Sequence, residues 1–259
     1  MKILVCFKVV KDIDYILKED WENIANITMD WSYVKNIFNC FDEGALENAL
    51  RLKDKLIINN IPVELHAITT TEVNCDLFNK LLLAVGYDKV VNLKGTADYF
   101  LPKRNAQIIY NYIQNENYDL IFTGFENAVG NNGVFPYTLA KLLNFNVLNK
   151  VTELDYCNGI IATIETETSF EKYGISEKTL FIIKNTENSS IRFPSLMDRL
   201  KAKNKPEIIE KIDNYNSNIL ENDLQIVNTK YVEEKANTNF LPNSIKQNVD
   251  FVLNEVQND

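Results

Sequence analysis

The 259-residue sequence has little of what several kinds of catalytic site require. It contains a single histidine, His66, so a His-centred triad or a His-rich metal site has almost nothing to draw on. The four cysteines include no C-x-x-C pair, which argues against a zinc site and against a secreted disulfide scaffold. We therefore interpret His66 as a structural residue and the cysteines as reduced, mostly buried thiols.

Positive charge and long apolar runs are also scarce. Lys and Arg total 27 against 36 Asp and Glu, and the net charge of -9 argues against a nucleic-acid-binding or anionic-membrane surface. No stretch reaches the ~18 apolar residues that a membrane helix needs, and the apolar run at the N-terminus is too short for a signal peptide. These absences predict a cytoplasmic protein with no nucleic-acid partner and no membrane insertion.

The apolar pattern that is present alternates between strand and helix signals, and 46% hydrophobic residues suffice for a large core. Strands are predicted over 3–10, 62–70, 89–93 and 120–124, and helices over 41–57, 76–86, 104–115 and 137–144. This alternation predicts an α/β fold, a doubly wound parallel sheet with right-handed crossovers. Segments 160–173 and 178–185 are predicted to pair as antiparallel strands joined through Gly174.

Two further features concern surfaces. Charged residues recur every four positions along the predicted helix 41–57, at Glu43, Glu47, Arg51 and Lys55, which is typical of a solvated helix face. From residue 204 the chain becomes rich in Asn, Lys and Glu and thinly apolar. We therefore expect a domain over 1–203 and a C-terminal arm over 204–259 that packs on a partner subunit.

One stretch, DLIFTGFENAVGNNGVFPYTLAKLL over 119–143, combines a buried strand, a polar loop with glycines and a helix. Such a loop places backbone N–H groups at the carboxyl end of a sheet, where open α/β folds bind ligands. It has neither the Gly-Lys-Ser/Thr of a phosphate loop nor the G-x-G-x-x-G spacing of a dinucleotide fingerprint. Residue spacing alone therefore predicts a candidate ligand-binding site but does not identify the ligand.

Five stretches occur in a fixed order: MKILVCFKVVKD at the start, then NCFDEGALENALRLKD, LLLAVGYDKVVNL, DLIFTG and IRFPSLMDRLKAKNKPE. Together, over about residues 1–207, they resemble the beta subunit of the electron transfer flavoproteins. The resemblance implies an adenine-nucleotide-binding α/β fold and an electron carrier subunit, not an enzyme with covalent chemistry of its own. It also implies an alpha-subunit partner, a redox FAD whose pocket both chains form, a bound AMP or second FAD, and docking to a flavin-containing dehydrogenase.

Matching this chain to the family motif by motif implies which residues contact the nucleotide and the dehydrogenase. The nucleotide positions are Cys6, Asn39, Thr69, Gly124, Asn131, Asn132, Gly133, Val134 and Phe135. The same matching implies that Leu196 docks to the dehydrogenase, and Arg192, which flanks it, suits the same docking surface. From the residues alone, Asn39 is equally well read as the cap of the helix that follows it.

The glycine-bearing loop departs from the family pattern. Val129 to Phe135 replace its acidic residues and glutamine, and Pro136 has no N–H to offer a phosphate. The C-terminal arm also has no glycine in ILENDLQIVNTKYV, where the FAD-binding members have a Gly-Ser-Pro-Thr stretch, which argues against a second FAD. The alternative is a nucleotide-binding regulatory or scaffold protein on the same fold with a degenerate site.

Overall fold

The computed structural model describes residues 1–17, 20, 32–71, 73–94, 101–126, 133–186 and 189–211. All of these except Leu17 and Asp20 belong to one unit, formed by Met1–Ile16 and Asp30–Gln225. Two predicted site residues, Asn131 and Asn132, lie outside the described residues, as does most of the predicted C-terminal arm, residues 212–259.

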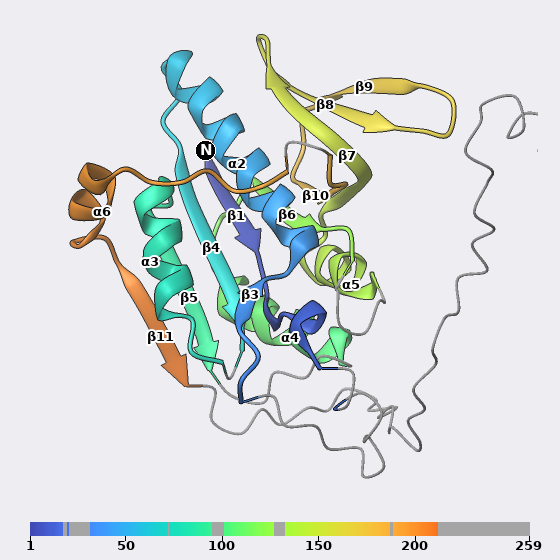
Figure 1. Ribbon diagram of the computed structural model, residues 1–259. Coiled ribbons are helices and arrows are strands. Elements are labelled where there is room, and N and C mark those ends of the chain that lie inside the picture. The colour runs from blue at the N-terminus through green and yellow to red at the C-terminus, as the bar shows by residue number, and fades with distance from the viewer. Residues whose placement is uncertain are drawn as a thin grey trace, which may run out of the picture. The chain divides into compact units, whose positions relative to one another are not determined.

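The unit is built on a twisted sheet with helices on both faces (Figure 1). In spatial order, its strands are β11 (Glu207–Lys211), β5 (Lys89–Lys94), β4 (Glu64–Thr70), β1 (Lys2–Cys6), β6 (Leu120–Gly124), β10 (Thr179–Ile183), β7 (Asn146–Tyr156), β8 (Ile160–Glu165) and β9 (Phe170–Ile175). Neighbours from β11 to β7 are parallel, and β8 and β9 continue the sheet antiparallel. The predicted doubly wound α/β fold is confirmed.

The helices bury two separate cores, one on each face of the sheet. They are α2 (Cys40–Ile58), α3 (Asp76–Val85), α4 (Pro102–Ile113), α5 (Val134–Leu143) and the short α6 (Leu196–Ala202). Residues of α2 and α3 pack on one face and residues of α4 and α5 on the other. Along β1, Ile3 and Val5 enter the first core while Leu4 and Cys6 enter the second, which explains its unbroken apolar run.

The first predicted strand, 3–10, is shorter than expected. β1 ends at Cys6, and the chain resumes as β2 (Val9–Lys11), which pairs antiparallel with β3 (Asn36–Phe38) outside the main sheet. At the break, the Lys8 backbone N–H donates to the Asp42 carboxylate and not to a neighbouring strand. Apolar content alone did not reveal this change of partner.

The prediction for 160–185 was wrong in its pairing. β8 pairs antiparallel with β9 through a turn in which Thr166 and Ser169 bond to each other, so Gly174 lies within β9 and not at the turn. β10 instead enters the parallel sheet between β6 and β7. All five residues of β10 are buried, as expected for a central strand covered on both faces.

The first residues of the predicted C-terminal arm belong to the sheet, since β11 pairs in parallel with β5 at its edge. Within the described residues, no helix combines the length and apolarity that crossing a membrane would require.

Candidate functional site

The strand order reverses at β1. From β1 the chain proceeds to β4 and β5 on one side, and then places β6 and β10 on the other. Open α/β sheets bind ligands in the crevice beyond the carboxyl ends of the strands at such a reversal. The candidate site therefore lies where β1, β4 and β6 end.

A cleft opens at this point and encloses about 650 Å³ of empty space, part of it open to solvent. Strand ends contribute Cys6, Thr70 and Gly124 to its lining. The N-terminal ends of three helices also line it, with Asn39 and Asp42 before and in α2, Pro102 and Asn105 in α4, and Gly133, Phe135 and Pro136 at α5. Helix N-termini carry a partial positive charge, so the cleft is suited to an anion.

The cleft brings together five of the residues that sequence matching pointed to: Cys6, Asn39, Gly124, Gly133 and Phe135. Thr69 does not line the cleft and is fully buried in β4, whereas Thr70 lines it. Neighbouring residues of a strand point to opposite faces, and Thr70 shares the face of Cys6. Val134, at the start of α5, is not part of the lining either.

Asp42 was missed by the sequence analysis, although it holds the cleft together. Its carboxylate accepts the Lys8 N–H at 2.8 Å and the Gly124 N–H at 3.2 Å. Burial raises the pKa of Asp42 to about 7, against the opposing effect of hydrogen bonds from Asn39, Lys8 and Gly124. No local pattern marks this role, because the two N–H donors are 34 and 82 positions away in the chain.

Glycine is required at position 124 by this close approach. A Cβ atom there would lie 2.4 Å from Asp42 Oδ1 and 2.6 Å from the Phe41 carbonyl oxygen. Gly133 is needed for a different reason, since its φ of +31° is in the left-handed region that side chains rarely adopt.

Asn39 occupies the N-cap position of α2, but its side chain makes no cap hydrogen bond to the helix. Its amide instead donates to the Glu126 carbonyl oxygen at 3.0 Å, and its backbone N–H donates to the Lys8 carbonyl oxygen at 2.8 Å. Asn39 thus ties the start of α2 to the loop after β6, across the cleft's lining.

The charges that line the cleft are mixed. Lys8 contributes one positive charge, while Asp42 and Glu126 are carboxylic acids. With the pKa of Asp42 near 7, this group is partly neutral at physiological pH, which reduces its repulsion of an anion.

The Cys6 thiol and the His66 imidazole are both buried. Burial raises the pKa of Cys6 far above its usual value, so the group stays a thiol and not a nucleophilic thiolate. His66 is buried in β4, with Nδ1 2.9 Å from the Tyr118 hydroxyl and Nε2 3.0 Å from Glu64. It is not part of the cleft lining. In the described part of the chain, no three His, Cys, Asp or Glu side chains are grouped to hold a metal ion.

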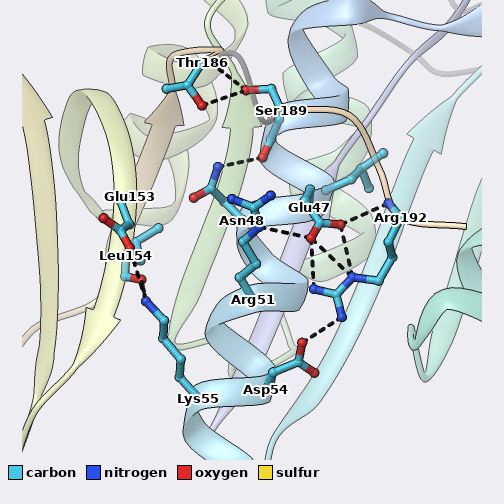
Figure 2. A network of polar contacts seen from close by, with 12 residues as sticks. Glu47, Asn48, Arg51, Asp54, Lys55, Glu153, Leu154, Thr186, Ser189 and Arg192 are labelled. Carbon is cyan, nitrogen blue, oxygen red and sulfur yellow. Dashed lines mark hydrogen bonds and ion pairs between the residues drawn. The ribbon is translucent and has the colours of Figure 1, made fainter.

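The residues predicted to dock a dehydrogenase lie away from the cleft, beside α2 and α6. Leu196 begins α6 and is 74% exposed. The Arg192 guanidinium, in contrast, is engaged within the chain by Glu47 and Asp54 (Figure 2). Glu47 is only 4% exposed, so the prediction of a solvated face along α2 was wrong at this position.

Comparison with known proteins places residues 27–208 against the family model described as "Electron transfer flavoprotein domain". The chain is 25% identical over 216 residues to the "Putative electron transfer flavoprotein subunit YgcR" of Escherichia coli (strain K12), which covers 82% of this chain and 81% of that protein. It is 28% identical over 210 residues to the "Electron transfer flavoprotein subunit beta" of Bacillus subtilis (strain 168), over 80% and 77% of the two chains. It is 26% identical over 209 residues to the protein of the same name from Syntrophomonas wolfei, over 80% and 78%.

Proposed function

Because the chain belongs to the electron transfer flavoprotein beta-subunit family, we propose that it pairs with an alpha-type subunit and helps to form that carrier's FAD pocket. The FAD would carry the electrons, and the protein would supply its binding, orientation and electrostatic environment. The relatives are named as electron transfer flavoprotein subunits, so we propose that this chain serves electron transfer and carries out no covalent catalysis.

The observation that carries the proposal is the cleft at the sheet's reversal point, lined by the N-terminal ends of α2, α4 and α5. We propose that it holds an adenine nucleotide with its phosphate toward these helix ends. Phe7, Ile109 and Phe135 offer apolar surface for a base, and Thr70 and Asn105 offer polar groups. AMP is our preferred ligand over a second FAD, because the arm has no glycine stretch.

Docking to a flavin-containing dehydrogenase would use the exposed Leu196. Apolar anchors of this kind contribute strongly to interfaces when they enter a pocket of the partner. The family assignment also supports an arm, within 204–259, that packs on the alpha-type subunit, and an action in the cytoplasm.

A test of the proposal is to co-express the chain with an alpha-type subunit, denature the purified complex and identify the released small molecules by chromatography and mass. One FAD together with one AMP would support the proposal. Release of two FAD molecules and no AMP would show that the second ligand is a flavin and not AMP.

A regulatory or scaffold role on the same fold is favoured by one observation, the presence of Glu126 in the cleft, since a carboxylate repels a phosphate. If the chain binds neither an alpha-type subunit nor a nucleotide, this second function should replace the first.

A further inference from the structure

We propose that Glu47 is a positioning residue, which holds the segment over residues 191–205 in the orientation that presents Leu196 to a partner. This segment is called the α6 segment below. The inference rests on the proposed docking role of Leu196, and it assigns to a buried residue of α2 the task of presenting that surface.

The α6 segment exposes a group of large apolar side chains. Phe193 is 90% exposed, Leu196 74%, Met197 60% and Leu200 48%. The helix itself has only seven residues, too few for an isolated helix to be stable in water. Its direction therefore depends on contacts with the rest of the chain, which are its packing against α3 and the polar contacts on either side of it.

The first of these contacts is the Glu47–Arg192 pair. Glu47 accepts the Arg192 backbone N–H at 3.1 Å and guanidinium N–H groups at 2.9 and 3.2 Å. The Arg192 Nη1 atom donates to Asp54 at 2.7 Å, about two turns beyond Glu47 along α2 (Figure 2). A carboxylate that binds both the backbone and the side chain of one residue fixes its position and its direction.

The second contact lies beyond the helix. The Lys205 ammonium donates to the carbonyl oxygens of Leu83 and Tyr87, at 2.9 and 2.8 Å, at the C-terminal end of α3. Within α6 itself, the last residue, Ala202, is buried in the first core. Between the two anchors, Ser195 and Asp198 form a capping box that sets where α6 begins.

In this arrangement, the residues that hold the α6 segment differ from the exposed residues that would contact the partner. The Arg192 guanidinium donates its hydrogen bonds to Glu47 and Asp54 of the same chain. It would therefore support docking by holding the segment in place together with Glu47, and not by contacting the partner as a cation. A surface that is already ordered loses less conformational entropy when a partner binds. Without Glu47, the partner would have to order residues 192–195 itself.

The experiment compares Glu47→Gln with the wild-type complex containing the alpha-type subunit. Amide hydrogen exchange over residues 192–200 should accelerate. With the flavin-containing dehydrogenase that reduces the wild-type complex, KM for the complex should rise about threefold to tenfold, from the ordering cost, while kcat and FAD content stay unchanged. Lys55→Gln is the matched control, since Lys55 lies on the same helix but contacts the Leu154 carbonyl and Asp155 of β7.

Several outcomes overturn the inference. Unchanged exchange in Glu47→Gln would show that the anchor is unnecessary, and faster exchange with an unchanged KM would show that it does not serve docking. A rise of equal size in Lys55→Gln would indicate a general effect on α2. If Leu196→Ala also leaves KM unchanged, the proposed docking function itself fails and takes the inference with it.

A second variant keeps the test decisive if Glu47→Gln does not accumulate as folded protein. Arg192→Lys retains the positive charge but cannot reproduce the planar fork of the guanidinium. It should raise KM in the same direction, and combining it with Glu47→Gln should add little if Glu47 acts through Arg192. Additive effects of the two changes would contradict the inference.

Discussion

The Gly124 backbone N–H donates to the Asp42 carboxylate at 3.2 Å and so joins the end of β6 to the start of α2. The same carboxylate accepts the Lys8 N–H at 2.8 Å, which brings in the chain that leaves β1. One buried side chain thereby sets the separation of two strand ends and a helix N-terminus around the cleft. Substitution of either Gly124 or Asp42 should therefore affect both folding and ligand retention.

Replacing Gly124 should disturb the cleft. In Gly124→Ala the new methyl group would overlap Asp42 Oδ1 and the Phe41 carbonyl, so the unfolding free energy should fall by about 1–3 kcal/mol, as for other overpacked sites. Urea denaturation and nucleotide content of the purified complex measure the two effects. Gly174→Ala, where no atom lies within 4 Å of the added Cβ, is the control and should change stability by less than about 0.5 kcal/mol. Equal behaviour of the two variants would contradict the close approach at Gly124.

Asp42 should make stability fall as pH rises. Its pKa is 3.8 in the reference state and about 7 in the folded chain, so between these values the folded chain keeps a proton that the unfolded chain has released. The stabilisation is therefore complete below about pH 4 and lost as pH rises through 7, by an amount on the order of a few kcal/mol. The difference in denaturation midpoint between wild type and Asp42→Asn, measured from pH 4 to 8, isolates this residue. A difference that stays flat or grows as pH rises would show that folding does not raise the pKa of the Asp42 carboxyl.

A negative charge at Gly133 should release an anionic ligand. Gly133→Asp places a carboxylate at the edge of the cleft, where it would repel a phosphate, while aspartate tolerates the left-handed backbone better than most residues. Gly133→Asn has nearly the same shape without the charge and is the matched control. Nucleotide content after purification should be lower in the Asp variant than in the Asn variant. Equal content would place the phosphate elsewhere.

Truncating Leu196 should slow electron transfer without changing the flavin. In Leu196→Ala, KM for the complex in reduction by the dehydrogenase should rise about tenfold, the consequence of losing roughly 1–2 kcal/mol at an interface anchor. Leu77→Ala, at a leucine of α3 that is 80% exposed, should have no such effect. If both variants behave like wild type in stopped-flow reduction, docking does not use α6.

Much of the fold could be read from local pattern. The continuous apolar runs of β1 and β6 and the helical spacing of α2 identify buried strands and an amphipathic helix, because the burial of a side chain follows the period of its own element. The glycine-bearing stretch over 119–143 pointed to the strand end at Gly124, which does line the cleft. Family motifs added Cys6 and Asn39, which also line it.

Local pattern could predict neither which strands pair nor which polar side chains are buried. β10 follows β8 and β9 in the chain, but only the sheet assigns it to β6 and β7 instead. Thr69 and Thr70 are chemically alike, and the register of β4 against β1 decides that Thr70 shares the face of Cys6.

Glu47 and Asp42 show the physical reason most clearly. In the chain both are ordinary acidic residues in the first half of a helix, where a carboxylate is usually solvated. Their partners Arg192 and Gly124 are 145 and 82 positions away. A local pattern can determine which residues form an element, because propensity and periodicity act over a few positions. Only the tertiary structure decides which distant N–H or guanidinium group donates a hydrogen bond to a buried carboxylate. In this protein, those hydrogen bonds shape the cleft and the α6 segment.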